Sequence, residues 1–293
     1  PMDEVMRVLV PGGVAMVRTG DGWNRTVKPW PENIDQWSHY LHDATGNSVS
    51  QDDVVAPPRH LQWVGSPRWS RHHDHMFSVS AVLSSGGRVF TIFDQGRHES
   101  IQLPSDWALI ARDAFNGTIL WKRPIEEWHV RLWPLKSGPA ELPRRLVAIG
   151  DTVYVTLGLD APVTALDAAT GETIRTFEGT ASTEEIIHSD STLFLVVDKS
   201  PTHRETLRST VESLAEVKRL HSETAFGETE RTIMAVDAGS GQVLWEHDSV
   251  VMPLTLAADA KRNYFHDGTK LVCLDRGTGQ QQWATEPIAR RPK

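Results

Sequence analysis

The stretch Ala111-Arg-Asp113-Ala-Phe-Asn-Gly117 is the first of four copies of one pattern, Ala-x-Asp-x-x-x-Gly. Its glycine suits a tight turn that needs positive φ, and its aspartate can accept hydrogen bonds from the backbone N–H groups of the turn. Short apolar runs lie on both sides of the turn, so each copy predicts a β-hairpin. The other copies lie at residues 165–171, 235–241 and 273–279, the last with cysteine in place of alanine.

Three of the copies place a tryptophan four residues after the glycine, at Trp121, Trp245 and Trp283, and the second copy has Arg175 there. A tryptophan offers a large flat surface to bury against a neighbouring sheet. A second hairpin precedes each copy, with turns at residues 86–87, 150–151, 189–190 and 258–259.

Two hairpins make a four-stranded antiparallel sheet, and repeated sheets that cannot bury both faces alone are typical of β-propeller blades. We expect blades at residues 76–124, 143–178, 183–248 and 250–286. The run at residues 60–65 looks like a lone outer strand, of the kind that completes the last blade of a ring.

This pattern resembles the repeat of the pyrroloquinoline-quinone-type (PQQ-like) family over residues 58–288. Members of that family are propellers, and they include quinoprotein alcohol dehydrogenases and an outer-membrane assembly scaffold lipoprotein. The resemblance implies an all-β fold, a β-propeller of four-stranded antiparallel blades. About four blades are present, which we expect to be part of a seven- or eight-bladed ring. The repeated aspartates, glycines and tryptophans are then architecture rather than site residues.

Residues 1–27 are expected to form a helix, a turn and a strand, because Met2, Val5, Met6 and Leu9 have helical spacing and Pro-Gly-Gly follows. The stretch at residues 4–13 resembles the end of a class I SAM-dependent methyltransferase domain; an ordinary helix–turn–strand leader is the alternative. Residues 28–57 are a linker, and 58–293 are the partial propeller. An amphipathic helical insertion is expected at residues 199–230, within blade three.

Composition limits the partners. The 293 residues carry a net charge of −8 with no basic stripe, which argues against nucleic acid. No apolar run approaches the roughly 18 residues that a membrane span needs. The single cysteine, Cys273, cannot form an intrachain disulfide, whereas the quinoprotein resemblance implies a vicinal disulfide near the quinone.

The candidate site is the run Arg71-His72-His73-Asp74-His75, which precedes the expected innermost strand of blade one. Residues that precede inner strands ring the mouth of a propeller axis, where ligands bind. His73 and His75 alternate along the chain and face the same way, so they are candidate catalytic residues and candidate metal ligands, with Arg71 as a further catalytic candidate. Structural hydrogen bonding is the alternative reading of the same cluster.

Other polar residues are expected near the same mouth. His72 and Asp74 of the cluster are candidate substrate-binding residues, joined by Lys136 and Arg97 from the neighbouring connections. In the leader, His39 and His42 are spaced i, i+3 and would share a face on a helical turn, which suits packing better than a metal pair.

Two functions remain open. The first is a ligand-binding propeller with its site at the axis, acting as a quinoprotein-like oxidoreductase or on a carbohydrate. The second is a non-catalytic scaffold that contacts proteins through propeller loops, similar to the assembly lipoprotein. PQQ with calcium and a transition metal are the candidate cofactors, and the chain alone supports neither. The family resemblance favours the cell envelope or periplasm.

Overall fold

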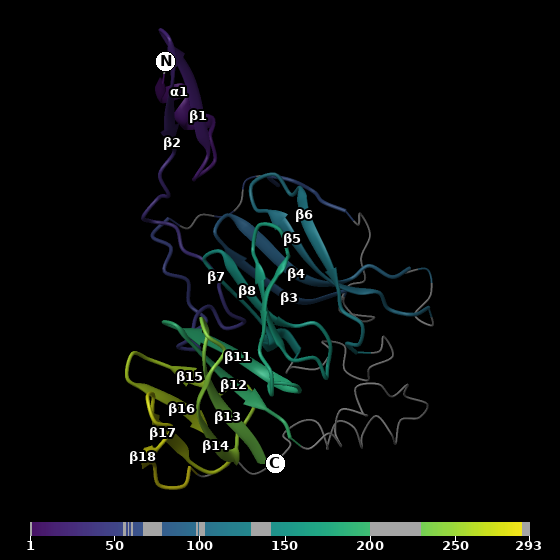
Figure 1. Cartoon of the computed structure of the whole chain (residues 1–293), viewed down its shortest axis with the longest axis vertical. Coiled ribbons are helices and arrows are strands. Elements are labelled where there is room, and N and C mark those ends of the chain that lie inside the picture. The colour runs from purple at the N-terminus through teal and green to yellow at the C-terminus, as the bar shows by residue number, and fades with distance from the viewer. Residues whose placement is uncertain are drawn as a thin grey trace.

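The computed structural model describes residues 2–54, 57, 59, 61–66, 78–97, 99, 103–129, 142–199 and 230–288. In this part of the chain the strands form four four-stranded antiparallel sheets and one separate hairpin, with one short α-helix (Figure 1). The predicted all-β fold of propeller blades is therefore confirmed.

Each sheet is one blade, and its four strands are consecutive in the sequence. Blade one is β3 (Val79–Ser85), β4 (Arg88–Asp94), β5 (Trp107–Asp113) and β6 (Ile119–Pro124). Blade two is β7 (Leu146–Ile149), β8 (Thr152–Thr156), β9 (Val163–Asp167) and β10 (Thr173–Thr176). Blade three is β11 (Thr183–Ser189), β12 (Thr192–Val197), β13 (Glu230–Asp237) and β14 (Val243–Val250). Blade four is β15 (Ala257–Ala258), β16 (Arg262–His266), β17 (Leu271–Asp275) and β18 (Gln281–Ala284).

The first strands of the blades lie innermost. β3 contacts β7, β7 contacts β11, and β11 contacts β15, so these four strands line a common axis. The hydrophobic core consists of three layers between successive blades. Phe90 of blade one and Val155 of blade two belong to one layer, Val163 of blade two and Leu195 of blade three to the next, and Phe194 of blade three and Phe265 of blade four to the third. Since each sheet buries its face against the next, stacking rather than a single centre supplies the core.

The repeated turns have the expected hydrogen bonds. In blade two, Asp167 Oδ1 accepts from the backbone N–H of Ala169 at 2.9 Å and of Thr170 at 2.8 Å. These bonds, with the one from Thr170 foremost, lower the pKa of the Asp167 carboxyl. Gly171 closes the turn with φ of 74°, a left-handed conformation that glycine adopts without strain.

The tryptophans of the outer strands β6 and β14 lie on the turn of the next blade. Trp121 of β6 covers Gly171, and its indole N–H donates to the carbonyl of Ala168 at 3.0 Å. Trp245 covers Gly279 in the same way. A Cβ at Gly171 would lie 2.6 Å from the Trp121 ring, so only glycine permits this contact. We call it the tryptophan lock.

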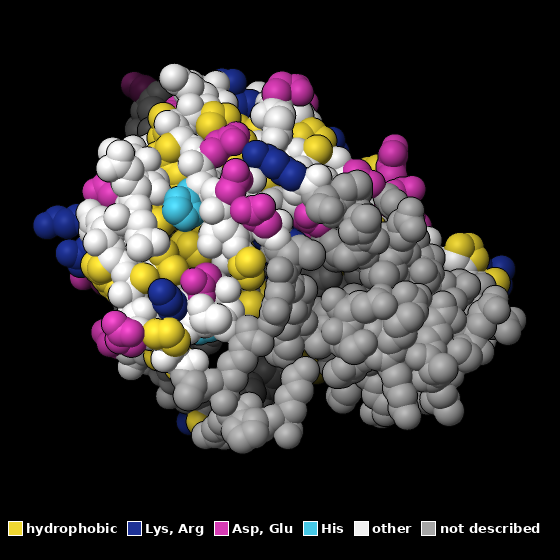
Figure 2. All heavy atoms as spheres, turned by 90° about the horizontal axis from the view of Figure 1, so that it is seen from below, with side chains coloured by type: hydrophobic (Ala, Val, Ile, Leu, Met, Phe, Trp, Pro, Cys, Tyr) yellow, Lys and Arg dark blue, Asp and Glu magenta, His cyan; other side chains and the backbone are white. Residues whose placement is uncertain are grey.

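The two ends of the blade array differ: the tryptophan lock is formed at blade one and is absent, among the described residues, at blade four. Trp63 covers Gly117 of blade one, and its indole N–H donates to Ala114 at 2.8 Å, although residues 61–66 do not form the expected outer strand. Trp283 of blade four has no such turn among the described residues and is 39% exposed, against 8% for Trp121. Figure 2 views the molecule from below, the end where blade four lies, and hydrophobic side chains show between polar ones there.

The N-terminal residues form the expected helix, turn and strand. Helix α1 (Met2–Val8) is followed by the hairpin of β1 (Val14–Thr19) and β2 (Gly22–Val27), which projects away from the blades (Figure 1). No residue of α1 is buried, and Ala15 is the one buried residue among α1, β1 and β2. The helical insertion expected at residues 199–230 lies almost entirely outside the described residues.

Candidate ligand site at the propeller axis

The two ends of the blades differ in their connections. At one end, the turn end, first and second strands are joined by tight turns, and the repeated aspartate turns join third and fourth strands. At the other end, the loop end, first and third strands begin and second and fourth strands end. The loop end is therefore where residues that precede inner strands gather, and the predicted site belongs there.

Most of the predicted site residues lie outside the described part of the chain. These are Arg71, His72, His73, Asp74, His75 and Lys136. Arg97 is described: it follows β4 at the loop end, its side chain is 78% exposed, and it pairs with Glu99 at 3.3 Å. Its assignment as a substrate-binding residue stays a prediction.

The loop end holds ionisable side chains that are buried, and the sequence analysis did not single them out. Arg144 precedes β7, and its guanidinium forms an ion pair with Glu185 of β11. The two side chains are 5% and 7% exposed. Beside them, Arg231 Nε of β13 lies 2.8 Å from Glu184 Oε2.

The Arg144–Glu185 pair joins blade two to blade three. Burial raises the pKa of the Glu185 carboxyl, while the nearby Arg144 charge opposes that rise. Glu185 engages only the NH1 group, and the Nε–H of Arg144 is buried without a partner among the described residues. A buried donor without a partner costs free energy, which makes this position a place where an acceptor would bind favourably.

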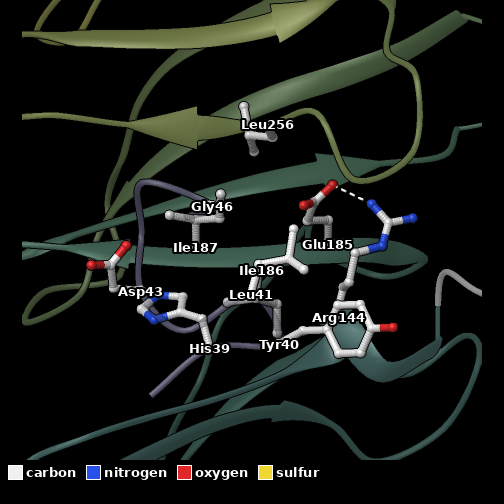
Figure 3. Close-up of a pocket in the computed structure, with 10 residues that line it drawn as sticks. All are labelled: His39, Tyr40, Leu41, Asp43, Gly46, Arg144, Glu185, Ile186, Ile187 and Leu256. Carbon is white, nitrogen blue, oxygen red and sulfur yellow. Dashed lines mark hydrogen bonds and ion pairs between the residues drawn. The ribbon is translucent and has the colours of Figure 1, made fainter. Parts of the chain in front are cut away.

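A small cavity of about 20 Å³ lies beside this pair, near the inner strands (Figure 3). Its walls come from the leader on one side and from blades two, three and four on the other. A cavity of this size has room for about one water molecule, which is far below the volume of a sugar or quinone site. The lining residues are His39, Tyr40, Leu41, Asp43, Gly46, Arg144, Glu185, Ile186, Ile187 and Leu256.

His39 is the buried imidazole of this region. Its Nε2 accepts a hydrogen bond from the backbone N–H of His188 at 3.0 Å, and its Nδ1 lies 2.8 Å from Ser38 Oγ. An accepting Nε2 requires the proton on Nδ1, so the neutral ring fits both contacts. Burial lowers the pKa of His39 to about 4, and repulsion from His188 adds to this.

The leader does not form the helical turn expected for His39 and His42. His42 adopts φ of 75°, and the two residues form an antiparallel bridge instead. His42 Nε2 lies 2.6 Å from Asp35 Oδ2, so the two rings serve different contacts rather than one face.

The described residues do not fit a quinone with its calcium ion. The carboxylates that line the cavity are Glu185, which pairs with Arg144, and Asp43, whose Oδ1 accepts from Thr45. No group of three or more His, Cys, Asp or Glu side chains in the described ranges is placed to hold a metal. We therefore assign no chemical step to a quinone.

No helix in the described ranges is long and apolar enough to cross a membrane.

Three comparisons place the chain among known proteins. The family model described as outer membrane protein assembly factor BamB matches residues 37–177 and 201–291. That match begins after the methyltransferase-like segment, which gains no support from it. No curated protein sequence matches the chain.

Among solved structures, the chain is similar to the quinohemoprotein alcohol dehydrogenase of Comamonas testosteroni, with 13% identity and a TM-score of 0.48. The alignment covers 86% of this chain and 41% of that one. A europium-containing methanol dehydrogenase gives 10% identity and a TM-score of 0.46, covering 86% of this chain and 49% of that one. BamB from Moraxella catarrhalis gives 12% identity and a TM-score of 0.38, covering 94% and 76%.

The chain thus spans less than half the length of the two dehydrogenases. The family match, by contrast, covers most of its residues, including all four repeated turns. This chain belongs to the PQQ-like repeat family whose model is described as outer membrane protein assembly factor BamB.

Proposed function

We propose that this chain is a ligand-binding part of a β-propeller and that its ligand is a small polar molecule bound at the loop end of the axis. The observation that supports this is the gathering of buried ionisable groups at that end, with Arg144 and Glu185 nearest the axis and Arg231 and Glu184 beside them. Burial of such groups costs free energy, and they concentrate at functional sites. At the turn end the aspartates are exposed, as at Asp151, and the buried Arg112 donates to the backbone carbonyl of Gly117 rather than to a carboxylate.

The catalytic form of this proposal depends on the cluster before β3. There, His73 and His75 would move protons or hold a transition metal, with Arg71 beside them. Candidate reactions are the transformation of a carbohydrate and a quinoprotein-like oxidation, and the second requires quinone and calcium contacts from outside the described residues. Substrate contacts would come from His72, Asp74, Lys136 and Arg97.

Calorimetric titration of the purified chain tests the proposal with two probes, pyrroloquinoline quinone with calcium chloride and D-galacturonate. We expect one probe to bind and His73→Ala combined with His75→Ala to abolish binding, with the melting temperature almost unchanged. Asp151→Asn at the turn end is the matched control and should bind as the parent does. Failure of both probes to bind, or unchanged binding by the double variant, would contradict the axial site.

A protein-binding scaffold is the second candidate, favoured by the family description as an assembly factor. In this function the loop end contacts a protein rather than a small molecule. A photo-crosslinking residue at Arg97 should then trap one discrete partner in cells, whereas the same residue at Asp151 should not. Equal crosslinking from both ends would argue against a loop-end docking surface.

A further inference from the structure

Residues 36–46 cross from blade to blade near the turn end and contact the inner strand of every blade. We call this segment the axial strap. It accepts a hydrogen bond from the backbone N–H of Ser84 at 2.8 Å, of Ala148 at 2.9 Å, of His188 at 3.0 Å and of Ala258 at 2.8 Å. These four donors precede the first turn of their blades at corresponding positions, so the strap covers the same edge position four times.

Three of the four acceptors are backbone carbonyls, of Trp37, Ser38 and Ala44. A carbonyl oxygen accepts a hydrogen bond at any ordinary pH. The acceptor at blade three is the side chain of His39, whose Nε2 has a lone pair only while the ring is unprotonated. The contact to blade three is therefore the one contact of this set that acid can remove.

We propose that the axial strap is an acid-releasable clamp, which holds all four blades at neutral pH and detaches from blade three when His39 takes up a proton. A protonated ring would direct its Nε2–H at the backbone N–H of His188, so attraction would turn into repulsion. The contacts to blades one, two and four do not involve a titrating group.

The charged surroundings of His39 set the direction of this effect. On the strap, Asp43 favours the charged ring and His42 disfavours it, and His42 is itself paired with Asp35. From β11, His188 disfavours it, and burial is the largest influence of all. Across the cavity, Arg144 and Glu185 offset each other as an ion pair. The sum lowers the pKa of His39 to about 4, so release needs acid.

The size of the effect follows from linkage between proton binding and opening. A released ring regains its ordinary pKa of about 6.5 and takes up a proton far more readily than the clamped ring. The opening equilibrium at blade three should therefore rise roughly 20- to 30-fold between about pH 7.5 and 5. Opening at the other three contacts has no such dependence on His39.

Amide hydrogen exchange of the intact chain, corrected for the intrinsic pH dependence of exchange, measures all four contacts at once. The four reporters are the backbone N–H groups of Ser84, Ala148, His188 and Ala258. On acidification from about pH 7.5 to 5, we expect the protection of the His188 amide to fall roughly 20- to 30-fold. The protection of the Ser84, Ala148 and Ala258 amides should change several-fold less. Equal loss at all four, or no loss at His188, would overturn the proposal.

The matched variant is His39→Gln, whose side-chain oxygen can still accept a hydrogen bond but does not titrate. It should make the protection of the His188 amide nearly independent of pH. His188 also titrates, with a pKa lowered by burial and a ring stacked on Tyr154 at 5.2 Å. An unchanged acid response in His39→Gln would assign the switch to His188 and refute the role of His39. If this variant fails to fold, His188→Phe removes the other titrating ring while keeping an aromatic ring against Tyr154. The acid response of the amide at position 188 should persist in it, and its loss would refute the role of His39.

Discussion

At the turn end of the blades one contact recurs, with Trp121 on Gly171 and Trp245 on Gly279, whereas at the loop end the buried ion pairs differ from blade to blade. The turn end uses exposed aspartate–glycine turns that any blade can present to its neighbour. The loop end places Arg144 and Glu185 where no repeat requires them. The comparison indicates that the repeat builds the blades and the contacts between them, whereas the buried ion pairs of the loop end lie outside the repeat.

The largest expected effect comes from opening one tryptophan lock. Trp121→Ala removes a buried ring and its hydrogen bond to Ala168, so unfolding free energy should fall by about 3 to 5 kcal/mol in urea titration. Trp283→Ala is the matched control, since its ring is 39% exposed and covers no turn among the described residues. It should cost under about 1 kcal/mol. An equal loss of unfolding free energy in the two variants would show that packing on a glycine turn gives Trp121 no advantage over Trp283.

The next effect concerns the loop end. Arg144→Met leaves Glu185 buried without its cation, and we expect a loss of about 3 kcal/mol in the free energy of unfolding. Arg144→Met combined with Glu185→Leu removes both charges and should lie within about 1 kcal/mol of the parent. The same urea titrations measure both. A double variant as unstable as the single one would show that the pair stabilises the fold rather than serving a ligand.

Acid should weaken the fold through His39. The pKa of this residue is lowered to about 4 in the folded chain, so on acidification the unfolded chain takes up the proton first. The stabilising contribution is complete above about pH 6.5 and is lost as the pH falls toward 4, amounting to about 2 kcal/mol between about pH 7.5 and 5. Denaturation curves at the two pH values measure it. His39→Gln should lose less stability over this interval, and equal losses would contradict the assignment.

A stabilising change is expected at Asn263 of blade four. Its amide is fully buried, and neither Nδ2 nor Oδ1 has a hydrogen-bond partner among the residues that the structure describes. In each blade the turn aspartate of the third strand pairs with a residue of the second strand, and Asn263 is the residue that follows this partner in blade four. The same position in the other blades holds Val89, Val153 and Leu193. Asn263→Leu should therefore raise the melting temperature and add about 1 to 2 kcal/mol. A loss of stability would show that the amide holds a bound water or another ligand.

The smallest effect is expected where the repeat lacks its tryptophan. Arg175 lies on Gly241 and donates to the carbonyl of Ser240 at 2.8 Å, but this contact is exposed. Arg175→Ala should cost under about 1 kcal/mol by urea titration. A cost as large as that of Trp121→Ala would mean that the cation locks blades as firmly as an indole does.

Sequence alone predicted the repeated architecture because its signals are local. The Asp167 turn and the Trp121 position follow from spacing within one hairpin. Arg144, Glu185 and the strap contact of His39 were missed because they meet only after distant segments fold together, and no short motif marks such pairs. The His72–His75 cluster remains a prediction, since its residues lie outside the described ranges.

The central claim, that a tryptophan of one blade packs on the turn of the next, is tested most directly by a double-mutant cycle of Trp121→Ala and Gly171→Ala. A new Cβ at Gly171 would meet the Trp121 ring, so both changes break the same contact. We predict that the double variant is more stable than the sum of the single costs by about 2 kcal/mol. Costs that add to within about 0.5 kcal/mol would contradict the lock.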